Sequence, residues 1–439
     1  MPVATIRSPK RRPRSQPSRA DWFRYYADFS GEFVEDVISH LDLDSDATLL
    51  DPWLGGGTTA EIATAKGIRF KGYDINPAML LVSRARTIPT EAATQIPRLV
   101  ESITRSFKIK SGNVNESDAD TDQLEQWLQP ASARAFRILE RSVENCLSDP
   151  ESISRVPLWR RTGQASPILS VFYVALFRTL RHFIWAFESS NPTWVKVVDE
   201  GKRIQVSPDR ILNRFHKEIR RLSESMTAEQ AVMPASTNRS CVISRASSSR
   251  LPLASNSIDA AVSSPPYCTR IDYVRATLPE LAVIGHPNGR VIRRLRERMI
   301  GTPTIDECEE YETDHWGTTC ARFLSAVERH TSKASSTYYL KYYQQYFASI
   351  FASLKEIDRV LKPNGRCVLV VQDSYYKNKK NNLPRMFIEM AAHYGWSLNR
   401  KKPFRVNQTL AGVNPGVKPY RSTFHATEWV LAFSKTSQD

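Results

Sequence analysis

The sequence of 439 residues lacks the cysteine and histidine spacings of a disulfide framework or a metal site. It contains no Cys-x-x-Cys pair, and its eight histidines form no cluster at metal-ligand spacing. Its six cysteines are Cys146, Cys241, Cys268, Cys308, Cys320 and Cys367. Unpaired, scattered cysteines are typical of a reducing compartment. The sequence therefore predicts a cytoplasmic protein that binds no metal.

The sequence also lacks an uninterrupted apolar run long enough to cross a bilayer. Its most apolar stretch, Ile168 to Phe187, is broken by Arg178, Arg181 and His182. A membrane-spanning helix needs about 20 mostly apolar residues. The N-terminus is basic and has no apolar segment of the signal-peptide type. We therefore expect this stretch to be a buried amphipathic helix and expect no membrane partner.

Acidic residues are too few to balance the basic ones. Against 46 Asp and Glu stand 61 Lys and Arg, which gives a net charge of +15. This balance favours a polyanionic partner such as nucleic acid. Residues 1–20 are expected to form a disordered basic arm, since they are rich in Pro, Ser and Arg. The basic residues of the arm are Arg7, Lys10, Arg11, Arg12, Arg14 and Arg19. A DNA-contacting arm and a simple disordered or targeting tail both fit this composition.

Glycine is scarce, with 17 residues, yet three glycines stand together at positions 55–57. They belong to the segment Leu49 to Thr59, LLDPWLGGGTT, which is typical of a strand that turns tightly into a helix. The start of a helix behind such a turn favours a bound carboxylate. A second strand-like segment ends at Asp74, and in this order the acid binds a ribose diol. The full G-x-G-x-x-G pattern is absent, which disfavours a dinucleotide.

A second motif, Ser264-Pro265-Pro266-Tyr267, follows the apolar run Ile258 to Val262. We call it the SPPY corner. Its prolines fix φ and carry no N–H, so main-chain carbonyls stay available to a ligand. The Ser264 hydroxyl and the Pro265 carbonyl can accept the two hydrogens of an exocyclic amine, and the Tyr267 ring can stack on a base.

Together the two motifs resemble those of the S-adenosylmethionine-dependent DNA amino-methyltransferases, and the SPPY corner resembles their cytosine-N4 members. The resemblance makes Ser264, Pro265, Pro266 and Tyr267 the catalytic residues. It also assigns cofactor binding to Phe29, Asp51, Pro52, Trp53, Gly55, Gly57, Thr58, Thr59, Asp74 and Ser247. Phe29 lies in the expected cofactor-capping segment, and Ser247 stands where the family carries Asp against the adenine amine.

The function implied by the resemblance is methyl transfer from S-adenosylmethionine to the N4 amine of a cytosine flipped out of double-stranded DNA. A role in a restriction or phage-defence system, with a cognate nuclease or defence-complex subunits as partners, follows from the resemblance alone. Three alternatives stay open: methylation of adenine N6 in DNA, methylation of a base amine in RNA, or a catalytically silent homologue that only binds nucleic acid. Serine at position 264 favours cytosine. The sequence has no Pro-Cys, which disfavours cytosine-C5 methylation.

The order of elements predicts an α/β fold, a Rossmann-like class I methyltransferase sheet with an inserted helical region. We expect a first part of the catalytic domain at 21–89, a mainly helical insertion at 90–238 and a second part of the catalytic domain at 239–439. Expected strands cover 48–51, 69–74, 240–244, 257–263, 367–372 and 427–433. Long helices are expected at 336–361 and 384–394, and a Lys/Arg-rich connection follows the second of them.

An arginine-rich segment, about 275–332, is expected to contact DNA. The candidate DNA-binding residues are Arg270, Tyr273, Arg290, Arg293, Arg294 and Arg298. At helical spacing, Arg290, Arg294 and Arg298 share one face and can follow a row of phosphates. A solvated basic face fits the same spacing.

Overall fold

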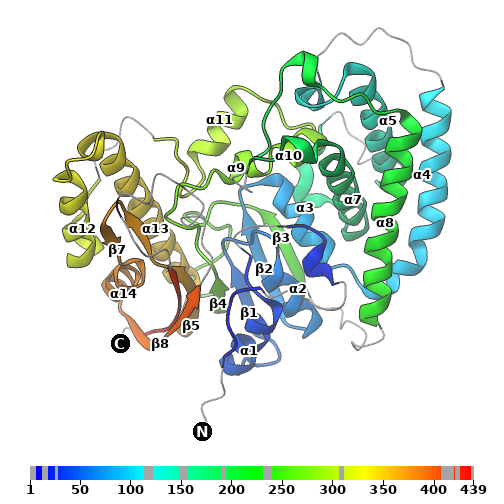
Figure 1. The fold of residues 1–439 in the computed structure, drawn as a ribbon. Coiled ribbons are helices and arrows are strands. Elements are labelled where there is room, and N and C mark those ends of the chain that lie inside the picture. The colour runs from blue at the N-terminus through cyan, green and yellow to red at the C-terminus, as the bar shows by residue number, and fades with distance from the viewer. Residues whose placement is uncertain are drawn as a thin grey trace.

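The computed structural model describes residues 6–11, 18–24, 28–112, 122–148, 156–189, 194–230, 240–305, 311–406, 420 and 426–436. Within them lies a seven-stranded sheet with the order β3-β2-β1-β4-β5-β9-β8 (Figure 1). In that order the strands are β3 (Cys241–Arg245), β2 (Arg69–Asp74), β1 (Thr48–Asp51), β4 (Ile258–Ser263), β5 (Leu361–Gln372), β9 (Ala426–Lys435) and β8 (Trp396–Val406). The first five strands are parallel, and β9 is antiparallel to both its neighbours.

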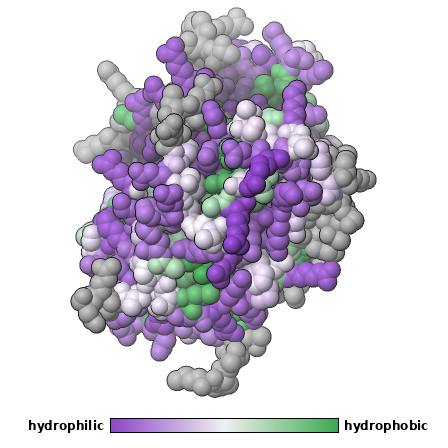
Figure 2. Space-filling model, turned by 90° about the vertical axis from the view of Figure 1, so that its left-hand side faces the viewer, coloured by the Kyte–Doolittle hydropathy of each residue, from purple (hydrophilic) through white to green (hydrophobic). Residues whose placement is uncertain are grey.

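Each central strand buries side chains on both faces of the sheet, because successive residues of a strand point to opposite sides. In β5, Val368 and Val370 pack on one face, while Leu369 and Val371 pack on the other. The first face is covered by α1 (Gly31–Leu41) and α2 (Thr58–Ala65). The second face is covered by α12 (Thr318–Glu328), α13 (Leu340–Val360) and α14 (Leu383–His393). The outer surface on this side is mainly hydrophilic, with small apolar patches (Figure 2).

A helical region lies beside the β3 end of the sheet (Figure 1). It contains α4 (Ile96–Ser111), α5 (Pro130–Leu147), α6 (Leu158–Arg161), α7 (Pro167–Ile184) and α8 (Pro208–Gln230). Helix α3 (Pro77–Arg86) joins it to the sheet, and every residue of α3 is buried. Leu80 packs toward the sheet, while Met79 and Val82 pack into the helical region. Helix α3 therefore packs between two apolar cores, one against the sheet and one within the helical region.

The segment that follows the SPPY corner contributes to the core of the helical region. It forms α9 (Tyr273–Ala276), α10 (Leu278–Val283) and α11 (Arg290–Glu297). Leu281, Leu295 and Met299 pack with the helical region. Arg181 of α7 donates to Glu280 of α10 at 2.7 Å. The described part of the predicted arginine-rich segment is thus structured, and it contacts both the helical region and the sheet side of the protein.

The Lys/Arg-rich connection predicted after residue 394 is wrong, because residues 396–406 form strand β8. Strand β8 pairs only with β9 among the described strands, so it is an edge of the sheet. Lysines and a proline are common on exposed edges, where they discourage pairing with other chains. The charge that suggested a connection is thus the charge of an edge strand. A short hairpin, β6 (Ser374–Tyr376) with β7 (Lys379–Asn381), was also not predicted.

The described residues of the N-terminal arm are held against the protein, contrary to the expected disorder. Arg7 forms an ion pair with Asp36 at 2.8 Å, and Ile6 is buried. Arg19 is buried and donates to the carbonyl of Arg86 at 2.9 Å. Long-range contacts of this kind carry no local signal in the sequence. Arg12 and Arg14 lie outside the described residues.

One helix in the described part of the chain, Pro167–Phe187, is long and apolar enough to cross a membrane. It includes α7, and 67% of its most apolar 18-residue stretch is buried inside the protein. The described residues contain no group of three or more His, Cys, Asp or Glu side chains that would hold a metal ion.

Candidate functional site

A cavity of about 730 Å³, counting its open mouth, lies at the carboxyl ends of β1, β2 and β4. Ligands bind at this edge in open α/β sheets. The predicted residues that line it are Phe29, Asp51, Pro52, Trp53, Gly55, Thr58, Thr59, Asp74, Ser247, Ser264, Pro266, Tyr273 and Arg298. The cavity therefore brings together the glycine turn and the SPPY corner, which are about 200 residues apart in the sequence.

The glycine turn links β1 to α2 in the predicted manner. Gly57 has φ of +82° and is the N-cap of α2, so no side chain caps this helix. A Cβ at Gly57 would lie 2.6 Å from the Cα of Ser83, so α3 packs directly against the turn. Gly57 does not line the cavity, and its role is close packing. The uncapped first turn of α2, with Thr58 and Thr59, faces the cavity and suits a carboxylate.

Asp51, the last residue of β1, lines the cavity and also forms a hydrogen bond to β4. Its carboxyl accepts hydrogen bonds from the N–H of Trp53 at 3.2 Å and from the hydroxyl of Ser263 on β4. Burial raises the pKa of Asp51 to about 6. A buried carboxyl with this pKa gains from a positive ligand group placed beside it.

Asp74 ends β2 and lies against the glycine turn. Its two carboxyl oxygens accept from the N–H of Gly55 at 2.9 Å and the N–H of Asn76 at 2.8 Å. Burial raises the pKa of Asp74. Asp74 thus fixes the turn and the start of α3, and its carboxyl also lines the cavity.

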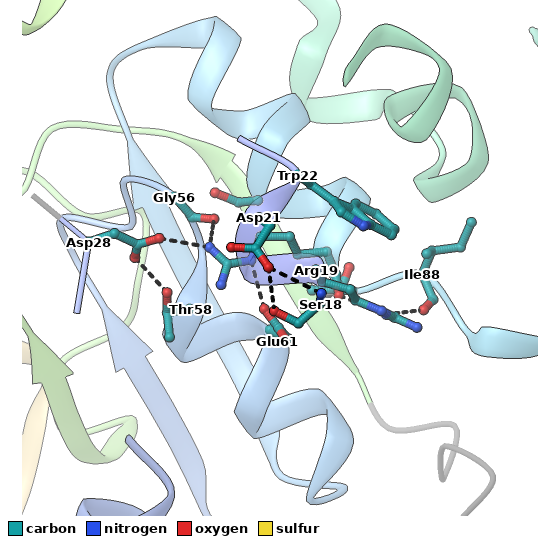
Figure 3. Close-up of polar contacts among 12 residues, drawn as sticks. Ser18, Arg19, Asp21, Trp22, Asp28, Gly56, Thr58, Glu61 and Ile88 are labelled. Carbon is teal, nitrogen blue, oxygen red and sulfur yellow. Dashed lines mark hydrogen bonds and ion pairs between the residues drawn. The ribbon is translucent and has the colours of Figure 1, made fainter. Parts of the chain in front are cut away.

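A buried ion-pair cluster, which the sequence did not reveal, supports the turn. Arg86 donates to Asp28 at 2.9 Å, to Glu61 at 2.7 Å and to the carbonyl of Gly56 at 2.8 Å. Asp28 also accepts from the hydroxyl of Thr58. Figure 3 shows Asp28, Gly56, Thr58 and Glu61 gathered around the start of α2. Because Asp28 and Phe29 both line the cavity, the cluster connects the predicted capping segment to the glycine turn.

Glycine at position 56 is required by this arrangement. A Cβ there would lie 2.8 Å from a carboxyl oxygen of Asp28 and 3.3 Å from Arg86. The nearby charges of Glu61 and Asp28 raise the pKa of Arg86 against the opposing effect of its burial. No local pattern joins positions 28, 61 and 86, so only the folded structure shows them as one unit.

The SPPY corner lies directly after β4. The hydroxyl of Ser264 donates to the carbonyl of Val370 on β5 at 3.3 Å. The hydroxyl hydrogen is therefore engaged in this bond, and the hydroxyl oxygen can accept a hydrogen bond from a group in the cavity. Pro266 lines the cavity, whereas Pro265 is buried and does not.

The main chain of the corner is anchored by two tyrosines. Tyr273 accepts from the N–H of Tyr267 at 3.2 Å, and Tyr346 donates to the carbonyl of Pro266 at 2.9 Å. Tyr273 is only 3% exposed and also lines the cavity, so its predicted contact with DNA is confined to a base inside the cavity. Its hydroxyl also supports the corner. Tyr267 does not line the cavity, and its own hydroxyl donates to Glu428 of β9 at 3.1 Å.

The arginines near the mouth of the cavity are placed differently from one another. Arg298, at the end of α11, lines the cavity together with Met299 and Ile300. Arg290 and Arg294 are exposed on the same helix. Arg293 is exposed and forms an ion pair with Glu297 at 2.9 Å.

Arg270 lies outside the cavity, next to the corner. It has φ of +57°, and its guanidinium stands 5.1 Å from the ring centre of Tyr339 and 5.9 Å from that of Tyr338. Ser247 is placed at the cavity as predicted, and its hydroxyl forms a hydrogen bond with Ser249 at 2.9 Å.

No protein-family model matches the chain. It is similar to the curated Type II methyltransferase M.BsoBI of Geobacillus stearothermophilus, with 24% identity over 305 residues, 64% of this chain and 55% of the relative. It is also similar to the Type II methyltransferase M.MvaI of Kocuria varians, with 22% identity over 230 residues, 50% of this chain and 46% of the relative. The chain spans about half the length of these curated relatives.

These similarities agree with the architecture. The chain has a mixed α/β fold with a mostly parallel central sheet, in the manner of a Rossmann-like methyltransferase, as the sequence predicted.

Proposed function

We propose that this chain is a DNA methyltransferase that transfers a methyl group from S-adenosylmethionine to the N4 amine of a cytosine in double-stranded DNA. The observation that carries the proposal is that the glycine turn and Ser264 line the same cavity. The similarity to two Type II methyltransferases supports DNA methylation. A modification role in a restriction or defence system, with a cognate nuclease, is part of the same proposal.

The residues around the cavity fit the cofactor by their chemistry. The uncapped start of α2 suits the carboxylate of its methionine part, and Asp51 suits the ammonium group. Asp74 lies where a ribose diol can donate to its carboxyl. The indole nitrogen of Trp53 is buried without a hydrogen-bond partner among the described residues, and so a donor remains for a ligand. When bound, the cofactor supplies a methyl group on a positively charged sulfur.

Ser264 orients the amine that receives the methyl group. Its hydrogen is committed to Val370, so its oxygen accepts one hydrogen of the amine. This bond keeps the nitrogen lone pair directed at the methyl carbon, and orientation of this kind lowers the barrier without a covalent intermediate. With the cofactor held by Asp51, Thr58 and Asp74, the amine nitrogen would take the methyl group as its bond to sulfur breaks, and the amine would release one proton to solvent.

The target base must leave the helix to reach this cavity, at a cost of a few kcal/mol for unstacking. Tyr267 follows Ser264 by three residues and stands beside the lining of the cavity, and its half-buried ring offers a stacking surface worth about 1–3 kcal/mol. Arg298 at the mouth, with Arg290 and Arg294 on α11, provides positive charge for the DNA strand that enters. Arg270, which is exposed and directly follows the corner, adds to this charge.

The proposal is tested by replacing Ser264→Ala and measuring methyl transfer from labelled S-adenosylmethionine to mixed-sequence duplex DNA. We expect kcat to fall by about tenfold or more, because a hydrogen bond to the reacting amine is lost. Cofactor affinity should stay unchanged, since the bond concerns only the base. Ser39→Ala, an exposed serine on α1, is the matched control. Equal activity of the two variants, or an inactive wild-type protein, would contradict the proposal.

A further inference from the structure

A buried acidic side chain lies beside the SPPY corner and belongs to neither motif. Glu428 of β9 pairs with Gln372 of β5 and with Phe404 of β8. Because β9 is antiparallel to β5, the first residues of β9 lie beside the carboxyl ends of the parallel strands. Glu428 is 8% exposed. Glu428 therefore lies inside the protein, at the same end of the strands as Ser264.

The carboxyl of Glu428 is incompletely satisfied. One oxygen accepts from the hydroxyl of Tyr267 at 3.1 Å. The other oxygen is buried and has no hydrogen-bond partner among the described residues. Burial of a carboxyl with one unbonded oxygen is costly even with the positive charge of Lys10 in range, and an apolar side chain at this position of β9 would pack at lower cost. Stability alone is thus a poor explanation for an acid at this position.

Its partner Tyr267 is anchored at the opposite end. The N–H of Tyr267 is held by Tyr273, and its carbonyl oxygen lies so close to Gly301 that a Cβ there would stand 2.8 Å away. The main chain of Tyr267 is therefore fixed by its neighbours, and the far end of its ring is fixed by Glu428. A ring held at both ends loses little freedom when it stacks on a base.

We infer that Glu428 is a positioning residue, which holds the ring of Tyr267 in the orientation that stacks on the flipped base. The inference rests on the proposed function and adds to it a residue from the last strand of the sheet. Glu428 acts through Tyr267 and takes no part in binding the cofactor.

A double-mutant cycle with Glu428→Leu and Tyr267→Phe tests this inference, using mixed-sequence duplex DNA and S-adenosylmethionine. Each variant removes one side of the same hydrogen bond. We expect each to lower kcat/KM for DNA by about tenfold, and the double variant to lower it by the same factor. Cofactor affinity should not change in any of them. Glu428→Gln keeps an acceptor for the tyrosine and should retain activity within about threefold of the wild type.

Independent losses, about a hundredfold in the double variant, would overturn the inference. Full activity in Glu428→Leu, or a loss of cofactor affinity in it, would overturn it as well. If the wild-type protein transfers no methyl group, the proposed function fails. Thermal unfolding then still tests whether Glu428 and Tyr267 interact. Tyr267→Phe should then lower Tm in the wild-type background and leave it unchanged in Glu428→Leu. Equal shifts in both backgrounds would refute the contact.

Discussion

At the scale of single residues, the site depends on carboxyl groups that serve the fold and face the cavity at once. Asp51 accepts from Ser263 and Trp53, and Asp74 accepts from Gly55 and Asn76. Both lie at strand ends, where main-chain N–H groups of the turns are within reach. Their burial raises the pKa of both. A positively charged ligand group beside them would therefore stabilise their ionised forms, which burial makes unfavourable.

The raised pKa of Asp51 predicts a pH dependence of cofactor binding. A value of about 6 means that Asp51 loses its negative charge as the pH falls below that point. The ammonium and sulfonium groups of S-adenosylmethionine keep their charge in this range. We expect affinity for the cofactor to be highest above pH 7 and to fall as the pH drops through 6.

Isothermal titration calorimetry between pH 5 and 8 measures this dependence directly. Asp51→Asn has no charge to lose, so its affinity should be weaker at pH 8 and nearly independent of pH. The same pH dependence in Asp51→Asn and in the wild type would show that another group is responsible.

At the scale of elements, the glycine turn is held from outside by the ion pairs of Arg86. This arginine joins α3 to the capping segment through Asp28 and to α2 through Glu61. Its side chain is 2% exposed. Loss of one member of such a group leaves opposite charges buried and unpaired, which costs more than the loss of a surface pair.

Arg86→Met is therefore expected to lower the free energy of unfolding by about 3–5 kcal/mol. Cofactor affinity should fall too, because the carbonyl of Gly56 and the carboxyl of Asp28 lose their support. Arg293→Met is the control, since it breaks an exposed pair with Glu297 and should cost about 0.5 kcal/mol. Urea unfolding of the three proteins gives the comparison, and a similar loss in both variants would contradict the role of the cluster.

Helix α11 carries a prediction about DNA. Arg290, Arg294 and Arg298 are exposed along it, and Arg298 reaches the mouth of the cavity. Each phosphate contact contributes about 0.9 to the slope of log affinity against log salt concentration. Replacing all three arginines with alanine should therefore reduce the magnitude of this slope by about 2–3.

The matched control removes three exposed cations of α4, on the far side of the helical region: Arg98, Arg105 and Lys108. It lowers the net charge equally and should leave the slope nearly unchanged. An equal reduction in both triple variants would mean that α11 acts only through the overall charge of the protein.

At the scale of the whole molecule, the sequence predicted the sheet well where strands are apolar and end in a motif. Strands β1, β2 and β4 lie where the sequence placed them, because Asp51, Asp74 and Ser264 mark their ends. Strand β8 was missed because its exposed edge is charged. The Arg86 cluster and Glu428 were missed because their partners are distant in sequence. Such contacts depend on how strands and helices are packed, and no local pattern encodes them.

We propose that the glycine turn and the SPPY corner form one methyl-transfer site for a DNA base. Nucleoside mass analysis of mixed-sequence duplex DNA, after incubation with the protein and S-adenosylmethionine, tests it most directly. We predict N4-methyldeoxycytidine, absent from a reaction without the cofactor. N6-methyldeoxyadenosine would preserve the site and contradict the choice of base. No methylated nucleoside in DNA would contradict the claim itself.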